Sequence, residues 1–158
     1  MSLPRKYLMI KDTKMELAIL EAKKAAKRDE IPVGALIQDA NGEIVALEGN
    51  RTRQLNDPTA HAEILAIRKA CNIKNQPYLG NYTIYVTLEP CSMCLAAIFA
   101  ARIGKLVFGI ASPKYGGLQG GFEAFDTHNC YQKPEIYGGF CEKEITSLLK
   151  TFFSDKRQ

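Results

Sequence analysis

Apolar positions near the start of the chain recur with a helical period and predict a helix over about residues 13–29. Thr13, with Glu16 three residues later, has the form of a capping box at the start of this helix. The apolar side is formed by Met15, Ala18, Ile19, Ala22 and Ala26. The other side carries a basic cluster made of Lys23, Lys24, Lys27 and Arg28. We interpret this cluster as a solvated face, with weak contact to RNA as the alternative.

Strand-like segments follow. Residues 33–37 form a short apolar run, and residues 44–47 form another after the turn-forming sequence DANG at 39–42. These two runs predict a β-hairpin. Residues 82–88 are rich in β-branched and aromatic side chains and predict a central strand. Two short segments predict a further strand at 106–108 and an edge strand at 135–137.

Three further helices are predicted at 61–71, 92–101 and 141–153, and the glycine-rich residues 112–121 predict a loop. The helix at 92–101 is apolar nearly all round, so we expect it to be buried in the core. The order of elements is α-β-β-α-β-α-β-β-α. It predicts an α/β fold, a mixed sheet with helices on both faces. The crossover between the strands at 82–88 and 106–108 should be parallel and right-handed.

Composition is that of a globular protein and excludes a disordered chain, a collagen-like repeat and a disulfide miniprotein. Hydrophobic residues make up 46% and charged residues 24% of 158 residues, so we expect one domain over 1–158. The net charge of +4 permits a nucleic-acid partner without predicting one. The longest apolar run, 95–101, is too short to span a membrane, and the N-terminus does not resemble a signal peptide. We therefore expect a cytoplasmic protein with no membrane partner.

We do not expect the five cysteines to form a disulfide framework, because their number is odd and the N-terminus does not resemble a signal peptide. We interpret Cys71, Cys130 and Cys141 as small buried apolar residues. Cys91 and Cys94 form a C-x-x-C pair, for which metal binding, redox chemistry and chance are the possible explanations.

Candidate metal ligands stand where predicted helices begin. A helix N-terminus favours the thiolate form of cysteine, which is the form that binds metal. His61, Cys91 and Cys94 supply three ligands, the number that a catalytic zinc site uses while it keeps one position open for water. Glu63, two residues from His61, has the reach to exchange protons with that water.

Other interpretations of these residues exist. The C-x-x-C pair has the form of a thioredoxin-like redox motif, and Cys71 or Cys130 as a fourth ligand would make a closed structural site. Taken together, however, H-x-E at 61–63 and P-C-x-x-C at 90–94 form the signature of zinc-dependent base deaminases.

Longer segments extend the resemblance. The chain also resembles bacterial tRNA-specific adenosine deaminases in six longer strings. They are EIPVGA at 30–35, GNRT at 49–52, DPTAHAEI at 57–64, YVTLEPCSMC at 85–94, ARIGKLVFG at 101–109 and FF at 152–153. The resemblance covers about residues 13–157. It implies a three-layer α/β/α cytidine-deaminase-like fold with a five-stranded sheet, a homodimer with the 92–101 helix at its interface, and conversion of the wobble adenosine of a tRNA, an arginine tRNA in particular, to inosine.

The resemblance also assigns roles to residues. It implies that His61, Cys91 and Cys94 hold zinc and that Glu63 is the general acid and base. It places Asn50 on the base and ribose, Val33 on the apolar wall of the pocket, and the backbone N–H of Ala62 on the exocyclic side of the base. The RNA contacts that it suggests are Ser112, Lys114, Phe152, Lys156 and Arg157. Ser112 stands where the family commonly has Asp, so that contact departs from the pattern. By helical spacing alone, at least one of Phe152 and Phe153 belongs in the core.

Two other functions are compatible with the sequence. A deaminase of a free nucleobase or nucleoside, such as guanine or cytosine, would use the same catalytic residues. A non-catalytic, zinc-stabilised RNA-binding domain would instead need a fourth protein ligand and would give Glu63 no role.

Overall fold

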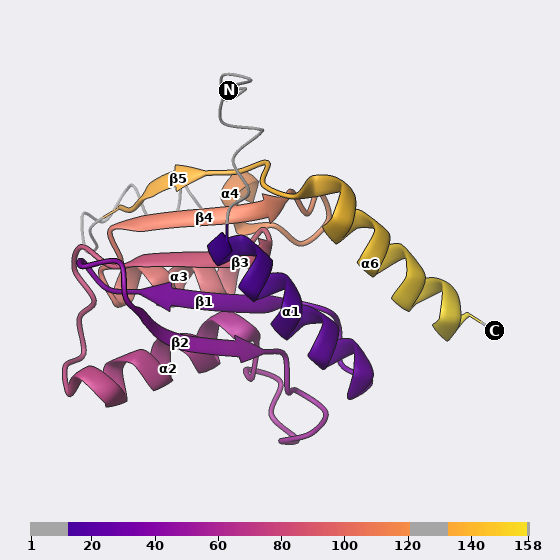
Figure 1. Cartoon of the computed structure of the whole chain (residues 1–158), viewed down its shortest axis with the longest axis horizontal. Coiled ribbons are helices and arrows are strands. Elements are labelled where there is room, and N and C mark those ends of the chain that lie inside the picture. The colour runs from indigo at the N-terminus through magenta and orange to yellow at the C-terminus, as the bar shows by residue number, and fades with distance from the viewer. Residues whose placement is uncertain (1–12, 121–132, 158) are drawn as a thin grey trace.

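The computed structural model describes residues 13–120 and 133–157, and its centre is a five-stranded mixed sheet in the order β2-β1-β3-β4-β5 (Figure 1). β1 runs antiparallel to both β2 and β3, whereas β3, β4 and β5 are parallel to one another. The predicted hairpin, central strand, edge strand and parallel crossover are thereby confirmed. The strands are β1 (Gly34–Gln38), β2 (Ile44–Gly49), β3 (Thr83–Leu88), β4 (Lys105–Ile110) and β5 (Glu135–Tyr137).

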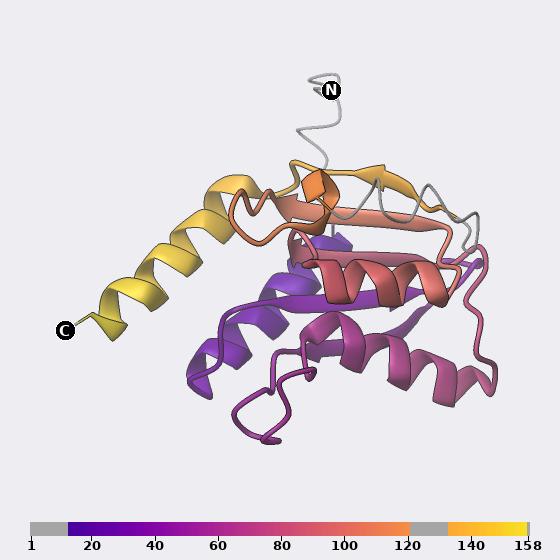
Figure 2. The same cartoon turned by 180° about the vertical axis from the view of Figure 1, so that it is seen from behind.

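Helices cover both faces of this sheet, which confirms the three-layer α/β/α fold. Figure 1 shows α1 and α6 in front of the sheet, and Figure 2, from behind, shows α2 and α3 on the other face. The helices are α1 (Thr13–Lys27), α2 (Ala62–Lys74), α3 (Ser92–Ala100), α4 (Gly117–Gly120) and α6 (Glu142–Lys156). Among the described residues, no helix is both long enough and apolar enough to cross a membrane.

Alternation along the strands divides the core into two layers. Odd and even residues of a strand point to opposite faces, so Leu36 packs towards α1 while its neighbours Ala35 and Ile37 pack towards α2 and α3. The larger cluster, between the sheet and α2 and α3, includes the buried Phe99 and Ile98. The helix at 92–101 is therefore a core helix, as its pattern predicts, although Met93 and Ala100 remain exposed on its outer side.

The structure departs from the sequence predictions in several places, one of them on α1, where Ala25 rather than Ala26 is buried. Residues 117–120 form the short helix α4 within the predicted loop, because the chain here packs against α3 and the Gly117 N–H bonds the Pro90 carbonyl at 2.8 Å. Cys71 and Cys141 are half-buried rather than buried, and Cys130 lies outside the described residues. Neither Phe152 nor Phe153 is in the core, because the last turns of α6 extend beyond the sheet, where Phe153 is 45% exposed (Figure 1).

Gly34 allows α1 to lie directly on β1. A Cβ atom at this position would be 1.8 Å from the Ala18 carbonyl oxygen and 2.8 Å from the Ala22 nitrogen, both in the backbone of α1. Neither atom can move without shifting the helix. The close contact of α1 and β1 therefore requires glycine at this position.

We predict that Gly34→Ala lowers the free energy of unfolding by about 1–3 kcal/mol, the usual cost of overpacking, measured by urea denaturation. Gly80→Ala is the matched control, because a Cβ there meets nothing within 4 Å and its φ is not positive. A Gly34→Ala protein as stable as the Gly80→Ala protein would contradict this account of the α1–β1 contact.

Candidate active site

Two helix N-termini meet beside the carboxyl ends of β3 and β4. His61 is the N-cap residue of α2, and Cys91 is the N-cap residue of α3 after Pro90 has ended the segment from β3. Cys94 follows in the first turn of α3. Because α2 and α3 pack side by side on the same face of the sheet, residues 30 positions apart in the sequence come together.

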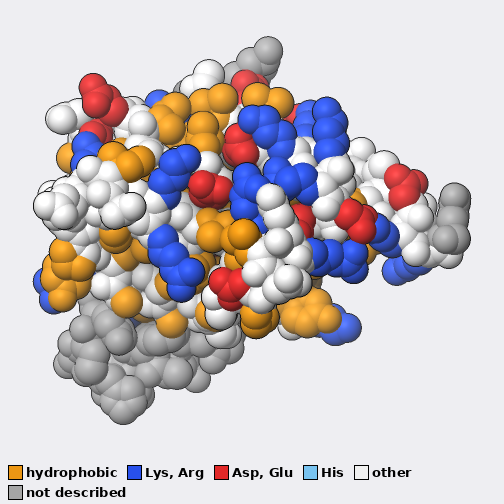
Figure 3. Space-filling view, turned by 90° about the horizontal axis from the view of Figure 1, so that it is seen from below, with side chains coloured by type: hydrophobic (Ala, Val, Ile, Leu, Met, Phe, Trp, Pro, Cys, Tyr) orange, Lys and Arg blue, Asp and Glu red, His pale blue; other side chains and the backbone are white. Residues whose placement is uncertain are grey.

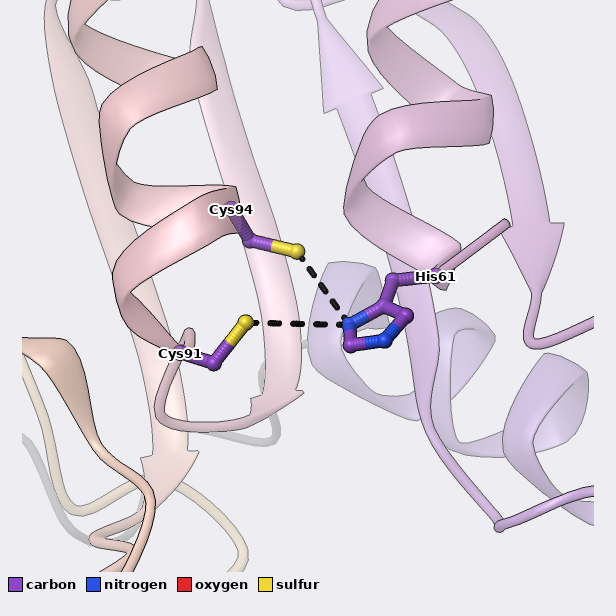
Figure 4. A group of neighbouring side chains, drawn as sticks. All are labelled: His61, Cys91 and Cys94. Carbon is purple, nitrogen blue, oxygen red and sulfur yellow. Dashed lines mark hydrogen bonds between the residues drawn. The ribbon is translucent and has the colours of Figure 1, made fainter. Parts of the chain in front are cut away.

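The donor atoms of these three residues fit a metal ion. The His61 Nδ1 lies 3.4 Å from the Cys94 Sγ and 3.7 Å from the Cys91 Sγ, and all three atoms lie within 4.8 Å of one another. Figure 4 shows both thiols, which come from α3, pointing towards the imidazole ring. Tetrahedral zinc with ordinary bond lengths would hold such nitrogen and sulfur atoms about 3.6 Å apart. The set has the size and the ligand types of a zinc site.

A fourth protein ligand is not found among the described residues. Cys71 is near the far end of α2, where its thiol lies 3.6 Å from the Pro77 carbonyl oxygen as a weak donor, and this distant position excludes it as a ligand. Cys130 lies outside the described residues. The arrangement is that of a site with an open position, which a closed structural zinc site lacks.

The two thiols differ in acidity. A hydrogen bond between them lowers the pKa of Cys91 to about 4, and the His61 imidazole contributes to the same shift. The same Cys91 contact raises the pKa of Cys94, and the hydrogen bond to Cys91 raises the pKa of His61. Cys91 is thus a thiolate at neutral pH and ready to bind a cation.

Glu63 is a buried carboxylate that lacks part of its hydrogen bonding. It lies in the first turn of α2, is 3% exposed, and its Oε1 has no hydrogen-bond partner among the described residues. Burial raises its pKa above the ordinary value. Buried polar atoms normally have a partner, so this oxygen is placed to meet a group that enters the site from outside the chain, such as a water molecule or a substrate.

A pocket of about 320 Å³ opens above these residues. Apolar side chains form part of its wall, and polar groups gather towards the metal ligands, as is usual for small-molecule sites. Its lining consists of Ile31, Val33, Asn50, Thr52, His61, Glu63, Leu88, Glu89, Cys91, Ser112 and Tyr115. A larger groove of about 790 Å³ is more open, lies along the far end of α2 near Cys71, and contains none of these groups.

Asn50 and Ala62 are joined by a hydrogen bond. The Ala62 N–H donates to the Asn50 Oδ1 at 2.9 Å, and the Asn50 N–H donates to the Val33 carbonyl at 3.2 Å. A substrate that uses either group must therefore share or replace this bond. The predicted roles of Asn50, Ala62 and Val33 stay predictions, and the structure brings all three to one side of the pocket.

Arg28 contradicts the interpretation of the basic cluster as a purely solvated face. It is half-buried, and its Nη2 donates to the Asn50 carbonyl at 3.1 Å. The reason is the turn after α1, which carries Arg28 under the end of β2. Lys23 and Lys24 do lie at the surface, where they pair with Glu144 and Glu21.

The predicted RNA contacts fall into two groups. In the first group, Ser112 lines the pocket and Lys114 is exposed beside Tyr115. The second group lies at the last turns of α6 and consists of Phe152, Lys156 and Arg157. Lys156 forms an ion pair with Asp29. Seen from below, Lys and Arg side chains gather over the surface with Asp and Glu between them (Figure 3). Tyr115, Glu30 and Glu89 are not predicted by the sequence patterns, because no local pattern marks a residue that lines or supports a pocket rim.

Residues 9–110 match the cytidine and deoxycytidylate deaminase zinc-binding region, and the chain belongs to this family. The zinc-binding region in the description of this family fits the zinc-type ligand set of His61, Cys91 and Cys94.

Relatives within the family are more specific. The tRNA-specific adenosine deaminase of Agrobacterium fabrum is 48% identical over 143 residues, which cover 90% of this chain and 93% of that protein. The predicted resemblance to bacterial tRNA-specific adenosine deaminases is thus confirmed. A solved structure from work on A-to-I editing by tRNA deaminases at the wobble position is 47% identical, with a TM-score of 0.81 over 87% of this chain and 99% of that one. A guanine deaminase from Nitrosomonas europaea shares the fold at 20% identity, with a TM-score of 0.76 over 97% and 94% of the two chains.

Glu30 holds the loop that follows β2 and borders the pocket. This carboxylate is 1% exposed and accepts the Gln54 N–H at 2.8 Å, the Thr52 hydroxyl at 3.2 Å and the Arg53 N–H at 3.3 Å. Burial by itself would raise its pKa, but these hydrogen bonds outweigh burial and keep the pKa below its ordinary value of 4.5. The charged form therefore stabilises the folded state.

We predict that Glu30→Gln lowers the free energy of unfolding by about 1–3 kcal/mol near neutral pH, the cost of weakening hydrogen bonds to a buried charge. Because the folded pKa is depressed, the stabilisation by Glu30 is present above pH 4.5 and is lost as the pH falls further. Urea denaturation between pH 3 and 7 measures the difference. Glu43→Gln, at an exposed carboxylate, should change little at any pH. A pH-independent loss in Glu30→Gln would contradict the ionic origin of the effect.

Proposed function

We propose that this protein hydrolyses the wobble adenosine of a tRNA anticodon to inosine and ammonia. The observation that carries the proposal is the buried, incompletely bonded carboxylate of Glu63 beside a three-ligand metal set at the base of a pocket. The choice of substrate is supported by the relatives named tRNA-specific adenosine deaminase, which the chain matches over nine tenths of its length.

In the proposed mechanism His61, Cys91 and Cys94 hold zinc, which when bound supplies Lewis-acid activation of a water molecule. Glu63 takes a proton from a water molecule while the oxygen of that water bonds to the ring carbon that carries the amino group. Glu63 then gives this proton to the adjacent ring nitrogen. It next takes the proton of the new hydroxyl group on the ring carbon and gives it to the departing amine, and the carbonyl group of inosine forms. The C–N bond breaks, ammonia leaves, and adenosine plus water becomes inosine plus ammonia. Burial raises the pKa of Glu63, the direction that makes its carboxylate a stronger base for these transfers.

The pocket residues orient the base in this proposal. Val33, which is 6% exposed, forms an apolar wall. Asn50 and the Ala62 N–H, which are hydrogen-bonded to each other, would share or exchange this bond with the base and ribose. A base in a folded RNA loop must turn out of its stack to enter a pocket of this kind. The anticodon stem-loop would then contact two groups of side chains, Ser112 and Lys114 at the rim and Phe152, Lys156 and Arg157 near the end of α6. Its phosphates would bind the cations Lys114, Lys156 and Arg157. We propose an arginine tRNA as the substrate and the cytoplasm as the location.

We predict that the protein forms inosine in an arginine-type anticodon stem-loop with A at the wobble position, and that Glu63→Gln loses about 10²–10⁴-fold of this turnover. Zinc per chain should not change, because Glu63 is not a ligand in the proposal. Inosine and ammonia are measured, with free adenosine, guanine and cytosine as parallel substrates.

Glu142→Gln is the matched control, since it changes an exposed carboxylate that also lies in the first turn of a helix. Turnover of a free base with an unreacted stem-loop would identify a small-molecule deaminase instead. Zinc and RNA binding without any turnover, unaffected by Glu63→Gln, would identify an RNA-binding domain.

A homodimer is a further part of the proposal. The outer side of α3 carries small or apolar side chains, of which Met93 is 37% exposed, Ala100 is exposed, and Ala96 and Ala97 are half-buried. Small side chains allow a second copy of the chain to approach closely. This surface supports an interface formed by α3 of two chains.

We predict that Ala97→Glu converts the dimer to a monomer, because the interface would then have to bury an unpaired charge. Sedimentation velocity measures the change. Ala26→Glu is the control, since Ala26 is equally half-buried but lies on α1, on the opposite face of the sheet. A monomeric wild-type protein, or a dimer that tolerates Ala97→Glu, would contradict the α3 interface.

A further inference from the structure

The rim of the pocket includes the segment from β4 to α4, residues 111–116, which we call the rim loop. It lies along the turn that carries Cys91. The Glu89 N–H donates to the Ile110 carbonyl and the Gly117 N–H donates to the Pro90 carbonyl, both at 2.8 Å. Cys91 and Gly116 also form an antiparallel bridge. Backbone hydrogen bonds therefore hold both ends of the rim loop against the turn that carries Cys91.

The side chain of Glu89 occupies the inside of this loop. It is 8% exposed, and its carboxylate lies close to the backbone of Ser112. A Cβ atom added to Gly116 would lie 1.1 Å from the Glu89 Oε2 and 2.6 Å from the Ser112 carbonyl oxygen. The φ of Gly116 is not positive, so space rather than backbone conformation requires glycine there. The loop closes around the carboxylate, with the Gly116 N–H bonded to the Ser112 carbonyl at 2.7 Å.

The rim loop presents an aromatic ring to the solvent beside the pocket. Tyr115 lines the pocket together with Ser112, and yet it is 67% exposed. The Lys114 Nζ lies 5.2 Å from the centre of the Tyr115 ring. An exposed aromatic ring next to a cation is the combination on which proteins stack unpaired nucleobases near a phosphate. Apart from Lys114, none of the described side chains forms a ring contact with Tyr115, and its outer face is open to a ligand.

We propose that Tyr115 stacks on an unpaired base next to the reacting nucleotide, and that Glu89 is the positioning residue that fixes the rim loop so that Tyr115 can do so. The inference rests on the proposed function, because it needs an RNA loop as the substrate. Glu89 acts through the loop, since its carboxylate faces Ser112 and Gly116. It deepens the proposed function by naming a side chain that distinguishes a nucleotide within RNA from a free nucleoside.

A double-mutant cycle on stem-loop deamination tests both residues. Tyr115→Ala and Glu89→Ala should each raise the KM for the stem-loop about tenfold, within the range for loss of one stacked base, with kcat within about twofold of wild type. The double variant should resemble either single variant, because Glu89 acts through Tyr115. Tyr115→Phe and Glu89→Gln, which keep the ring and the hydrogen-bond acceptor, should restore most of the affinity.

Tyr137→Ala is the control for the ring, because Tyr137 is an exposed tyrosine on β5 with a lysine, Lys105, 5.8 Å from its ring centre. Zinc per chain is measured for every variant. Additive KM effects, or a loss of zinc or of kcat in Glu89→Ala, would overturn the positioning role. An unchanged KM in Tyr115→Ala would overturn the stacking role. A wild-type protein inactive on the stem-loop would refute the proposed function itself, and the inference with it, whereas active wild type with unchanged variants refutes the inference alone.

Discussion

The requirement that three donor atoms lie within 4.8 Å of one another governs the rest of the structure. One donor comes from the start of α2 and two from the start of α3, so the two helices must begin at the same edge of the sheet and pack side by side. Small buried residues on α2, among them Ala66 and Ala70, permit this close packing. The parallel pairing of β3 and β4 then places the segment after β4 beside the Cys91 turn. The packing of α2 on α3 and the place of the pocket are therefore tied to one short distance.

Three buried carboxylates around the pocket behave differently because their surroundings differ. Glu30 is bonded to three groups of one loop, and its charge serves the fold. Glu89 is enclosed by the rim loop, against a glycine that leaves it room. Glu63 alone has a buried oxygen without a partner among the described residues. The degree to which the chain already satisfies a carboxylate therefore indicates whether it supports the structure or faces a substrate.

The sequence predicted most elements of the fold and the metal set, because both depend on local patterns. Strand alternation, helical spacing and the pair of motifs at His61 and Cys91 are visible within a few residues. It did not predict α4, which exists because residues 117–120 pack on α3, nor the burial of Arg28, which depends on the Asn50 carbonyl 22 positions away. Tyr115 was missed for the same reason, since its place at the pocket follows from contacts between segments. Long-range contacts carry information that no short window of sequence contains.

The weak attachment of α6 affects how its last turns behave in solution. Ile145 is its one buried side chain among the described residues. Two ion pairs of exposed groups also hold it, Lys23 of α1 with Glu144, and Asp29 of the turn after α1 with Lys156. Such pairs contribute little. The C-terminal half of this helix should therefore open locally at a much smaller free energy than global unfolding, with fast amide hydrogen exchange there and slow exchange in β1 and β3. Any ligand that binds the C-terminal half of α6 would also order that half of the helix. The entropy that the helix loses would then offset part of the favourable binding enthalpy.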